Sequence, residues 1–449
     1  MTADRAVYRA FQFGLGIFGL TALLGLANAT RIFGALSQDT LLTHLHSGTL
    51  GWITMGVIGV AIWMFAGRGE TLSRNVMISG LVTAAYVLAF WSGSFPARAI
   101  TGALELLVIL YWWWWALAQA RAEGFGRIDV PKLSLVLGLT ILTIGAIIGV
   151  TIQLFLALGV TLPTAPDLIG THASAQIGGY LVLVSAGVAE WRLSGGGSRS
   201  RAGLAQAYLL FLGGLLLAIG VGMNIQPFQG IATLFQVIGI VIIAVRFGGR
   251  ALRAGWGEAS GTRHIAIAVP FLVLGLILEI VFLAAIIQAQ GDFTKISLGM
   301  VHALDHTFFI GVMTNTLFGA ILLLTAAPVR TWPWADNLIF LGPESRRGIV
   351  HRGAAHRGLR VQLGTVPASG RVYRLGHGTR GTARDRHTPA AARCRAPNRT
   401  TVRGAGLAVY FLYVVSGGHG DFFCTDGPQP CTQSSALAGS NIGSKRARS

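Results

Sequence analysis

Five histidines lie near the starts of three long apolar segments, and their side chains could do chemistry. They are His44 and His46, His172, and His302 and His306. If the three segments cross a membrane in the same direction, all five imidazoles lie within roughly 15 Å of one surface, at about 1.5 Å of rise per helical residue. Polar groups inside a membrane are costly and mark functional paths. Imidazole nitrogen binds heme iron and transition metals, so the grouping predicts bound heme or metal.

The spacing of the histidines predicts how their rings are directed. His44 and His46 are about 200° apart around a helix, so they cannot bind one ion from the same side. They would instead face two neighbouring helices or two cofactors. His302 and His306 are four residues apart and share one helix face. Asp305 beside them could orient a ring through a hydrogen bond.

The composition is that of a membrane protein. Apolar residues make up 53% of the 449 positions and charged residues 12%, with a mean hydropathy of +0.61. A helix of roughly 20 apolar residues crosses the hydrocarbon core, and about ten such stretches precede residue 330. We therefore predict an all-α, polytopic transmembrane helix bundle. The predicted spans lie near 9–33, 42–66, 75–95, 99–120, 133–159, 168–190, 203–223, 229–247, 265–289 and 297–326.

The basic residues predict the orientation of these spans. With the N-terminus inside, the inner segments of residues 1–341 hold 15 Lys and Arg residues, whereas the outer loops hold Arg31, Arg98 and Lys295. Short cytoplasmic loops accumulate Lys and Arg, so we predict a cytoplasmic N-terminus and a location in the inner (plasma) membrane. Even-numbered spans then run from outside to inside. This direction places all five histidines near the outer surface.

The N-terminal segment has a second interpretation. Arg5 and Arg9, the apolar run after them and Ala27-Asn28-Ala29 together imitate a secretory signal with a small-residue cleavage site. The apolar run is at the long end for a signal. Cleavage there would leave the topology of the later spans unchanged.

The chain changes character near Leu341, which predicts a second region at residues 342–449. Residues 1–341 carry 18 Lys and Arg against 13 Asp and Glu, whereas the tail carries 17 against 4. The tail also lacks sustained periodicity from Arg346 to Arg403, and such a segment cannot offset the entropy of ordering. It could bind nucleic acid or anionic lipid, be an inert disordered extension, or be the product of a reading-frame shift, which we favour. All three cysteines lie in this tail, so residues 1–341 offer no thiolate ligand.

The segment His44–Trp52, with the sequence HLHSGTLGW, carries a family resemblance. It resembles the HxHxGxLGW signature of subunit I of the heme-copper oxidases, most closely that of the C-type branch. In that family a His-x-His pair supplies axial ligands to two hemes, one on either side of the helix. The resemblance covers residues 1–341 and matches a motif in the second span only. It implies heme bound by His44 or His46 together with His302 or His306.

The same resemblance implies a copper centre that this chain does not reproduce in full. The family's copper ligands are a histidine in the sixth helix and a vicinal pair in the seventh. His172 could stand for the first, but the predicted seventh span, 203–223, has no histidine. A histidine near a helix end also commonly hydrogen-bonds a neighbouring carbonyl, so a structural role for His172 stays open. Copper is therefore a secondary expectation beside one or two hemes.

Two carboxyl groups lie within apolar runs and predict a path for protons. Glu105 falls in the fourth predicted span and Glu279 in the ninth. A buried carboxyl stays protonated or finds a partner, so a proton relay and a structural hydrogen bond are the alternatives. Phosphate-binding loops, nucleophile elbows and zinc-protease motifs do not occur in the sequence.

These observations favour an integral membrane hemoprotein of electron transfer. Its partners would be membrane lipid and a small electron-donor protein or a quinol, with no specific nucleic acid. An oxidase or nitric oxide reductase activity would require a complete copper site. The rival hypotheses are a histidine-lined metal or proton transporter without heme, and a structural membrane subunit without chemistry.

Overall fold

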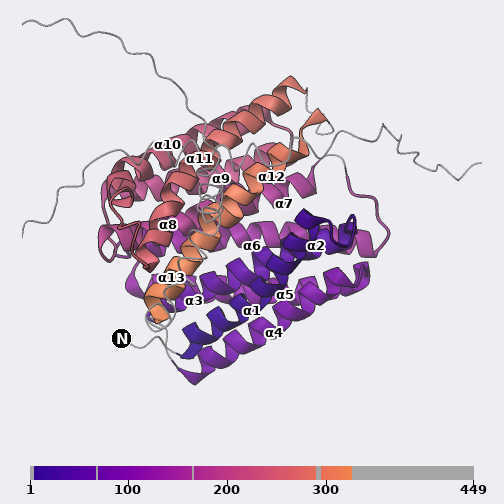
Figure 1. Ribbon diagram of the computed structural model, residues 1–449, viewed down its shortest axis with the longest axis horizontal. Coiled ribbons are helices and arrows are strands. Elements are labelled where there is room, and N and C mark those ends of the chain that lie inside the picture. Colours follow the sequence, from indigo (N-terminus) through magenta and orange to yellow (C-terminus); the bar gives the residue numbers. More distant parts are fainter. Residues whose placement is uncertain (1–4, 67–68, 164–165, 290–294, 326–449) are drawn as a thin grey trace, which may run out of the picture. The chain divides into compact units, whose positions relative to one another are not determined.

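Every regular element in the described part of the chain is a helix (Figure 1). The computed structural model describes residues 5–66, 69–163, 166–289 and 295–325. The predicted all-α class is confirmed for these residues. The tail predicted at 342–449 lies outside them.

The helices are α-helical except for three π-helical segments, which carry the label η. In chain order they are α1 (Arg5–Thr30), α2 (Gln38–His46), η1 (Ser47–Thr54), α3 (Met55–Met64), α4 (Glu70–Trp91), α5 (Phe95–Glu123), α6 (Val130–Ala157), α7 (Leu168–Ser174), η2 (Ala175–Leu181), α8 (Val182–Ser194), α9 (Arg201–Gly222), α10 (Gln226–Ala251), α11 (Gly261–Gln288), α12 (Leu298–His306), η4 (Thr307–Thr314) and α13 (Asn315–Thr325).

Nine of the helices formed by the described residues are long and apolar enough to cross a membrane. This confirms a multi-pass membrane protein, and the large apolar side chains exposed on the outer helices, such as Leu88 and Val245, fit contact with lipid. The sixth predicted span forms one continuous helix through α7, η2 and α8. It is not among the nine. The count of ten spans stays a prediction.

Side-chain caps begin several of the helices. The hydroxyl of Ser37 accepts a hydrogen bond from the Thr40 amide at the start of α2. Asp129 caps α6 in the same way, and Asp167 caps α7 by accepting from the Gly170 amide. Each cap satisfies an amide that has no partner within its own helix. The caps thereby set where two of the three histidine-bearing helices begin.

The three histidine-bearing helices form the centre of the bundle. We call them the inner helices: α2–η1–α3, α7–η2–α8 and α12–η4–α13. In the apolar window of Gln38–Met64, 83% of the residues are buried, and in that of Gly299–Thr325 the share is 67%. The most buried of the other spans, Val130–Ala157, reaches 56%. The histidines therefore start the helices that are most enclosed by protein.

Buried hydrogen bonds join the inner helices at their π-helical segments. The indole nitrogen of Trp52 in η1 donates to the hydroxyl oxygen of Thr314 in η4 at 3.0 Å. The hydroxyls of Thr54 in η1 and Tyr180 in η2 lie 3.2 Å apart and share a hydrogen bond. All four residues are buried. A π-helical turn is one residue wider than an α-helical one, and such turns are rare outside functional sites.

The two junctions are equivalent. Trp52 and Tyr180 are each the sixth residue of their π-helical segment, and Thr54 and Thr314 are each the eighth. Both threonine hydroxyls also donate to the carbonyl five residues earlier in their own segment, at 3.0 and 2.9 Å. The sixth residue of η4 is Val312, whose side chain cannot form such a hydrogen bond to η2. Two of the three junctions between the inner helices are therefore polar, and they use equivalent positions.

We predict that Trp52→Phe destabilises the bundle. The substitution keeps most of the buried ring but leaves the Thr314 hydroxyl without its donor from η1, so the free energy of unfolding should fall by about 0.5–2 kcal/mol. Denaturation of the purified protein in mixed detergent micelles measures this change. Trp91→Phe is the matched control, because Trp91 is 54% exposed. Equal stability of the two variants would contradict the junction's role.

Candidate functional site

The histidine-bearing helices α2, α7 and α12 lie toward one end of the bundle, and α3, α8 and α13 lie toward the other (Figure 1). A hollow of about 230 Å³ lies near the opposite end, where Trp63, Lys132 and Trp191 line it. Trp63 is 17 residues past His46 along one continuous helix, so this hollow is about 25 Å from the imidazoles. The histidines form a site of their own.

His44 is held against the first helix. Its Nδ1 atom lies 2.9 Å from the carbonyl oxygen of Thr21 in α1. Its ring packs on Gly25, one turn further along α1, where an added Cβ would lie 2.9 Å from the ring carbon Cε1. Only glycine leaves room for the ring at this position.

His172 is held against α6 by the same arrangement. Its Nδ1 atom lies 2.8 Å from the carbonyl oxygen of Gly145, and its ring packs on Gly149, one turn further along α6. An added Cβ at Gly149 would lie 2.8 Å from the Cε1 atom of His172. His44 and His172 each lie three residues before a π-helical segment, so they occupy equivalent positions on two inner helices.

His46 and His306 are fixed by their own helices. The Nδ1 atom of His46 lies 2.8 Å from the carbonyl oxygen of Leu42, and that of His306 lies 2.8 Å from the carbonyl oxygen of His302. Both histidines directly precede a π-helical segment. They form a second pair of equivalent positions.

These contacts decide which ring nitrogen can bind a ligand. A carbonyl oxygen only accepts hydrogen bonds, so the Nδ1 atoms of His44, His46, His172 and His306 carry the proton and donate it. The neutral imidazole then has its lone pair on Nε2. Histidines that bind metals generally donate their other nitrogen in this way, which fixes the tautomer and the orientation of the ring. A hydrogen bond to a carbonyl was the structural alternative for His172, and here the same bond also prepares the ring as a ligand.

His44 and His46 contact different neighbouring helices. The predicted opposite directions of His44 and His46 agree with this arrangement, since the first contacts α1 and the second contacts α4. The convergence of the five histidines on one site stays a prediction.

His302 is placed differently from the other four. Its side chain and that of His306 are exposed, and their rings stand perpendicular with centroids 5.9 Å apart. The His302 carbonyl oxygen accepts a hydrogen bond from His306 Nδ1, so the backbone of His302 helps to orient the His306 ring. The predicted hydrogen bond between Asp305 and one of these rings stays a prediction.

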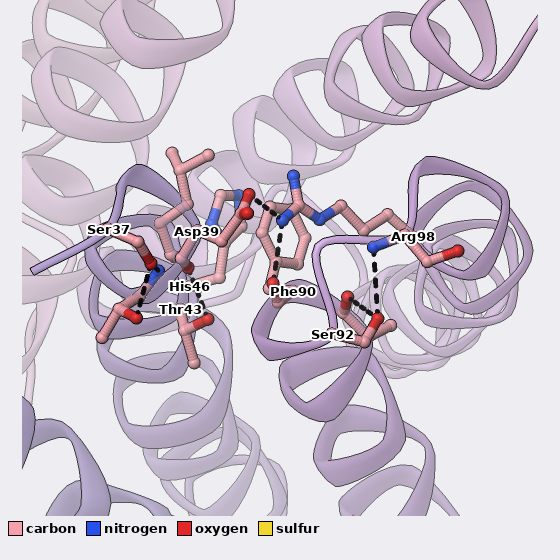
Figure 2. Close-up of polar contacts among 11 residues, drawn as sticks. Ser37, Asp39, Thr43, His46, Phe90, Ser92 and Arg98 are labelled. Atoms are coloured by element: carbon pink, nitrogen blue, oxygen red, sulfur yellow. Dashed lines mark hydrogen bonds and ion pairs between the residues drawn. The ribbon is translucent and has the colours of Figure 1, made fainter.

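The surroundings of His46 were not predicted from the sequence (Figure 2). Its ring stacks on that of Phe90 in α4 with centroids 3.9 Å apart, and it meets the edge of Tyr86 at 5.8 Å. The guanidinium of Arg98 lies over the same Phe90 ring, 4.7 Å from its centroid. The positive charge of Arg98 acts electrostatically on the His46 ring.

Arg98 is a buried cation, whereas the sequence placed it in an outer loop. It is 1% exposed and lies in the first turn of α5. Its Nη2 atom forms an ion pair with Asp39 Oδ1 at 2.5 Å and donates to the Phe90 carbonyl at 2.8 Å (Figure 2). Its Nε atom is buried and has no hydrogen-bond partner among the described residues. A Pro at the second position of α5 and the Ser94 cap begin the helix just before it, which brings the charge inside.

The small residues and the tryptophan of the HLHSGTLGW segment have packing roles. An added Cβ at Gly48 would lie 3.3 Å from the Thr21 side chain, and one at Gly51 would lie closer still to Ile17. These glycines let η1 approach α1. Trp52 bonds to η4, as described above. The motif therefore both presents two imidazoles and joins η1 to η4.

The two carboxyl groups predicted to form a proton path, those of Glu105 and Glu279, have different surroundings. Glu105 in α5 accepts hydrogen bonds from the Thr83 hydroxyl at 3.1 and 2.9 Å, so it has the structural partner that was the alternative to a relay. Glu279 in α11 has one buried carboxyl oxygen without a hydrogen-bond partner among the described residues. Their role in proton transfer stays a prediction.

No group of three or more His, Cys, Asp or Glu side chains is placed to hold an ion within the ranges that the structure describes. Each of the four histidines whose Nδ1 atom bonds a carbonyl could supply one ligand through its Nε2 atom. Comparisons of the sequence with protein-family models, with curated proteins and with solved structures gave no match.

We predict that the metal-free protein holds the four histidines whose Nδ1 atoms bond a carbonyl in the Nδ1-protonated tautomer. Nitrogen-15 NMR of the histidine rings distinguishes the two neutral tautomers, and the expected spectrum shows proton-bearing Nδ1 and unprotonated Nε2 atoms. Single His→Gln variants assign each signal. Protonation at Nε2 in His44 or His172 would contradict the bonds to the carbonyls of Thr21 and Gly145.

Proposed function

We propose that this chain is an integral membrane hemoprotein similar to subunit I of the heme-copper oxidases and that it takes part in electron transfer. The observation that carries the proposal is that His44 and His306, on two separate inner helices, each have the Nδ1 atom bonded to a backbone carbonyl. Both Nε2 atoms are left to act as axial ligands of one iron.

The chain's own residues prepare this site before a cofactor arrives. Gly25 and the Thr21 carbonyl hold the ring of His44, and the His302 carbonyl holds that of His306. A heme between two imidazoles supplies one-electron transfer and has no open position for oxygen. The side chain of His306 is exposed, so this end of the proposed site is accessible.

The orientation and partners follow as parts of the same proposal. Fifteen basic residues in the inner segments support a cytoplasmic N-terminus and an inner (plasma) membrane location, with the histidines near the outer face. A small electron-donor protein at that face or a quinol in the bilayer would supply the electrons. The family's oxygen-reducing centre is left out, because the chain offers no histidine in α9.

We predict that the purified protein shows a reduced spectrum with a sharp Soret band and resolved α and β bands. His44→Ala and His306→Ala should lose the signal of the heme that these two residues bind. His302→Ala should keep it, because that variant retains the carbonyl that orients His306. A folded protein with a featureless visible region would sink the proposal. In that case the transporter or the structural subunit explains the histidines.

We predict that Gly25→Ala weakens heme binding without removing a ligand. The new Cβ would lie 2.9 Å from the His44 ring, so the ring must shift and the iron bond lengthens. We expect a loss of affinity on the order of tenfold, as for other changes that reorient a ligand. Heme titration of the apoprotein measures it. Gly19→Ala on the same helix is the control, since its Cβ would meet nothing within 4 Å.

A further inference from the structure

We infer that the hollow at the end of the bundle opposite the histidines binds the headgroup of a phosphatidylethanolamine lipid. In this site Asp129 and the indole rings of Trp63 and Trp191 hold the ammonium group. The inference goes beyond the proposed heme function and does not rest on it, because the hollow lies about 25 Å from the imidazoles. Its volume is about 230 Å³. A cavity of about 150 Å³ already takes up benzene, so the hollow has room for an aminoethyl group.

The hollow lies where three helices end. Met64 is the last residue of α3, Gly196 lies just past the end of α8, and Asp129 directly precedes α6, and all three line the hollow. The C-termini of α3 and α8 carry the negative ends of their helix dipoles. The N-terminus of α6 carries a positive end, which the Asp129 carboxylate offsets. The surroundings therefore favour a cation.

The aromatic neighbours of the hollow indicate its depth in the membrane. The ring of Phe65, the residue after Met64, lies 6.1 Å from that of Trp115, and the ammonium of Lys132 lies 5.4 Å from the same Phe65 ring. Trp115 ends the run Trp112–Trp115 in α5. Tryptophan is enriched at the level of lipid headgroups. At this level a headgroup, rather than an acyl chain, is available to fill the hollow.

Two indole rings form one wall of the hollow. The rings of Trp63 in α3 and Trp191 in α8 have centroids 4.6 Å apart and planes 66° apart, so they meet as a corner and not as a flat stack. The face of an aromatic ring attracts a cation within about 6 Å of its centroid, and tryptophan does so most strongly. A corner of two indoles is therefore suited to an ammonium group.

The charged residues leave one carboxylate oxygen for the ligand. Asp129 Oδ1 accepts a hydrogen bond from the Lys132 amide at 2.9 Å, which leaves Oδ2 to accept from a ligand. The ammonium of Lys132 also lines the hollow, but it donates to both carboxylate oxygens of Glu123 at 2.8 and 2.7 Å. Two carboxylates against one ammonium leave a net negative charge. A primary ammonium can donate a charge-assisted hydrogen bond to Asp129, whereas a choline group cannot.

A guanidinium beside Asp129 suits the phosphate of the same headgroup. Arg199 Nη1 donates to the carbonyl oxygen of Ile128, the residue before Asp129, at 2.7 Å. The Arg199 side chain is exposed, and a guanidinium has further N–H groups in a fork that matches phosphate. An acidic hollow with a cation next to it is complementary to a zwitterion. This arrangement favours a phospholipid headgroup over a simple amine.

Native mass spectrometry of the purified full-length protein in detergent tests the site. The added lipids are phosphatidylethanolamine, phosphatidylcholine and phosphatidylglycerol with identical acyl chains. We expect phosphatidylethanolamine to bind on the order of tenfold more tightly than phosphatidylcholine, because it alone can donate to Asp129. Phosphatidylglycerol should bind most weakly of the three. Equal affinities for the three lipids, or tighter binding of phosphatidylglycerol, would overturn the inference.

Asp129→Asn removes the charge but keeps a side chain that can cap α6. We expect the affinity for phosphatidylethanolamine to fall on the order of tenfold in this variant. Asp167→Asn is the matched control, because Asp167 caps α7 in the same way near the histidines, and it should bind the lipid as the wild type does. Equal binding by the wild type and Asp129→Asn shows that the hollow is not the site.

Trp191→Phe is a second variant that keeps a ring but weakens its attraction for a cation. We expect about a threefold loss of affinity for phosphatidylethanolamine, whereas Trp114→Phe, at a tryptophan that is 56% exposed, should show none. This pair decides the matter if Asp129→Asn does not fold, and equal affinities in the two variants would then refute the inference. Displacement of the lipid by an equal concentration of soluble phosphoethanolamine would assign the hollow to a soluble amine instead.

Discussion

The hydrogen bond from a histidine Nδ1 atom to a backbone carbonyl is the interaction on which the whole site depends. Four imidazoles make this bond, two of them to neighbouring helices and two to their own. Each bond fixes a tautomer, aims a ring and leaves Nε2 for a ligand. In the membrane interior an imidazole without such a partner would be costly. One bond therefore both makes the histidine tolerable in the bundle and prepares it for chemistry.

The inner helices provide the geometry for these bonds. Each contains a π-helical segment directly after its histidines, and buried hydrogen bonds from Trp52 to Thr314 and between Thr54 and Tyr180 join the segments. Glycines let the rings and helices approach, as Gly25 does for His44. Below the site, the buried Glu190 pairs with Arg246 at 2.5 Å and links α8 to α10. Rigid central helices are a suitable frame for the proposed site.

The sequence predicted the helical class better than the contacts of the histidines. Apolar length located nearly every helix, and a 200° separation correctly sent His44 and His46 to different neighbours. Contacts between helices depend on long-range packing, so the stacking of His46 on Phe90 could not be seen in the sequence. Nor could the π-helical turns, which arise from one extra residue in a turn and leave no periodic signal. Its charge led to the prediction that Arg98 lies in an outer loop. In the structure α5 begins at Phe95, so Arg98 lies within the helix and forms an ion pair with Asp39.

The most direct measurement of the central claim is an electron paramagnetic resonance spectrum of the oxidised protein with nitrogen-15 histidine. The account predicts a low-spin ferric signal with hyperfine coupling to two imidazole nitrogens, lost for one iron when His44 or His306 is replaced. A purely high-spin signal, or a folded protein without a ferric heme signal, would contradict it.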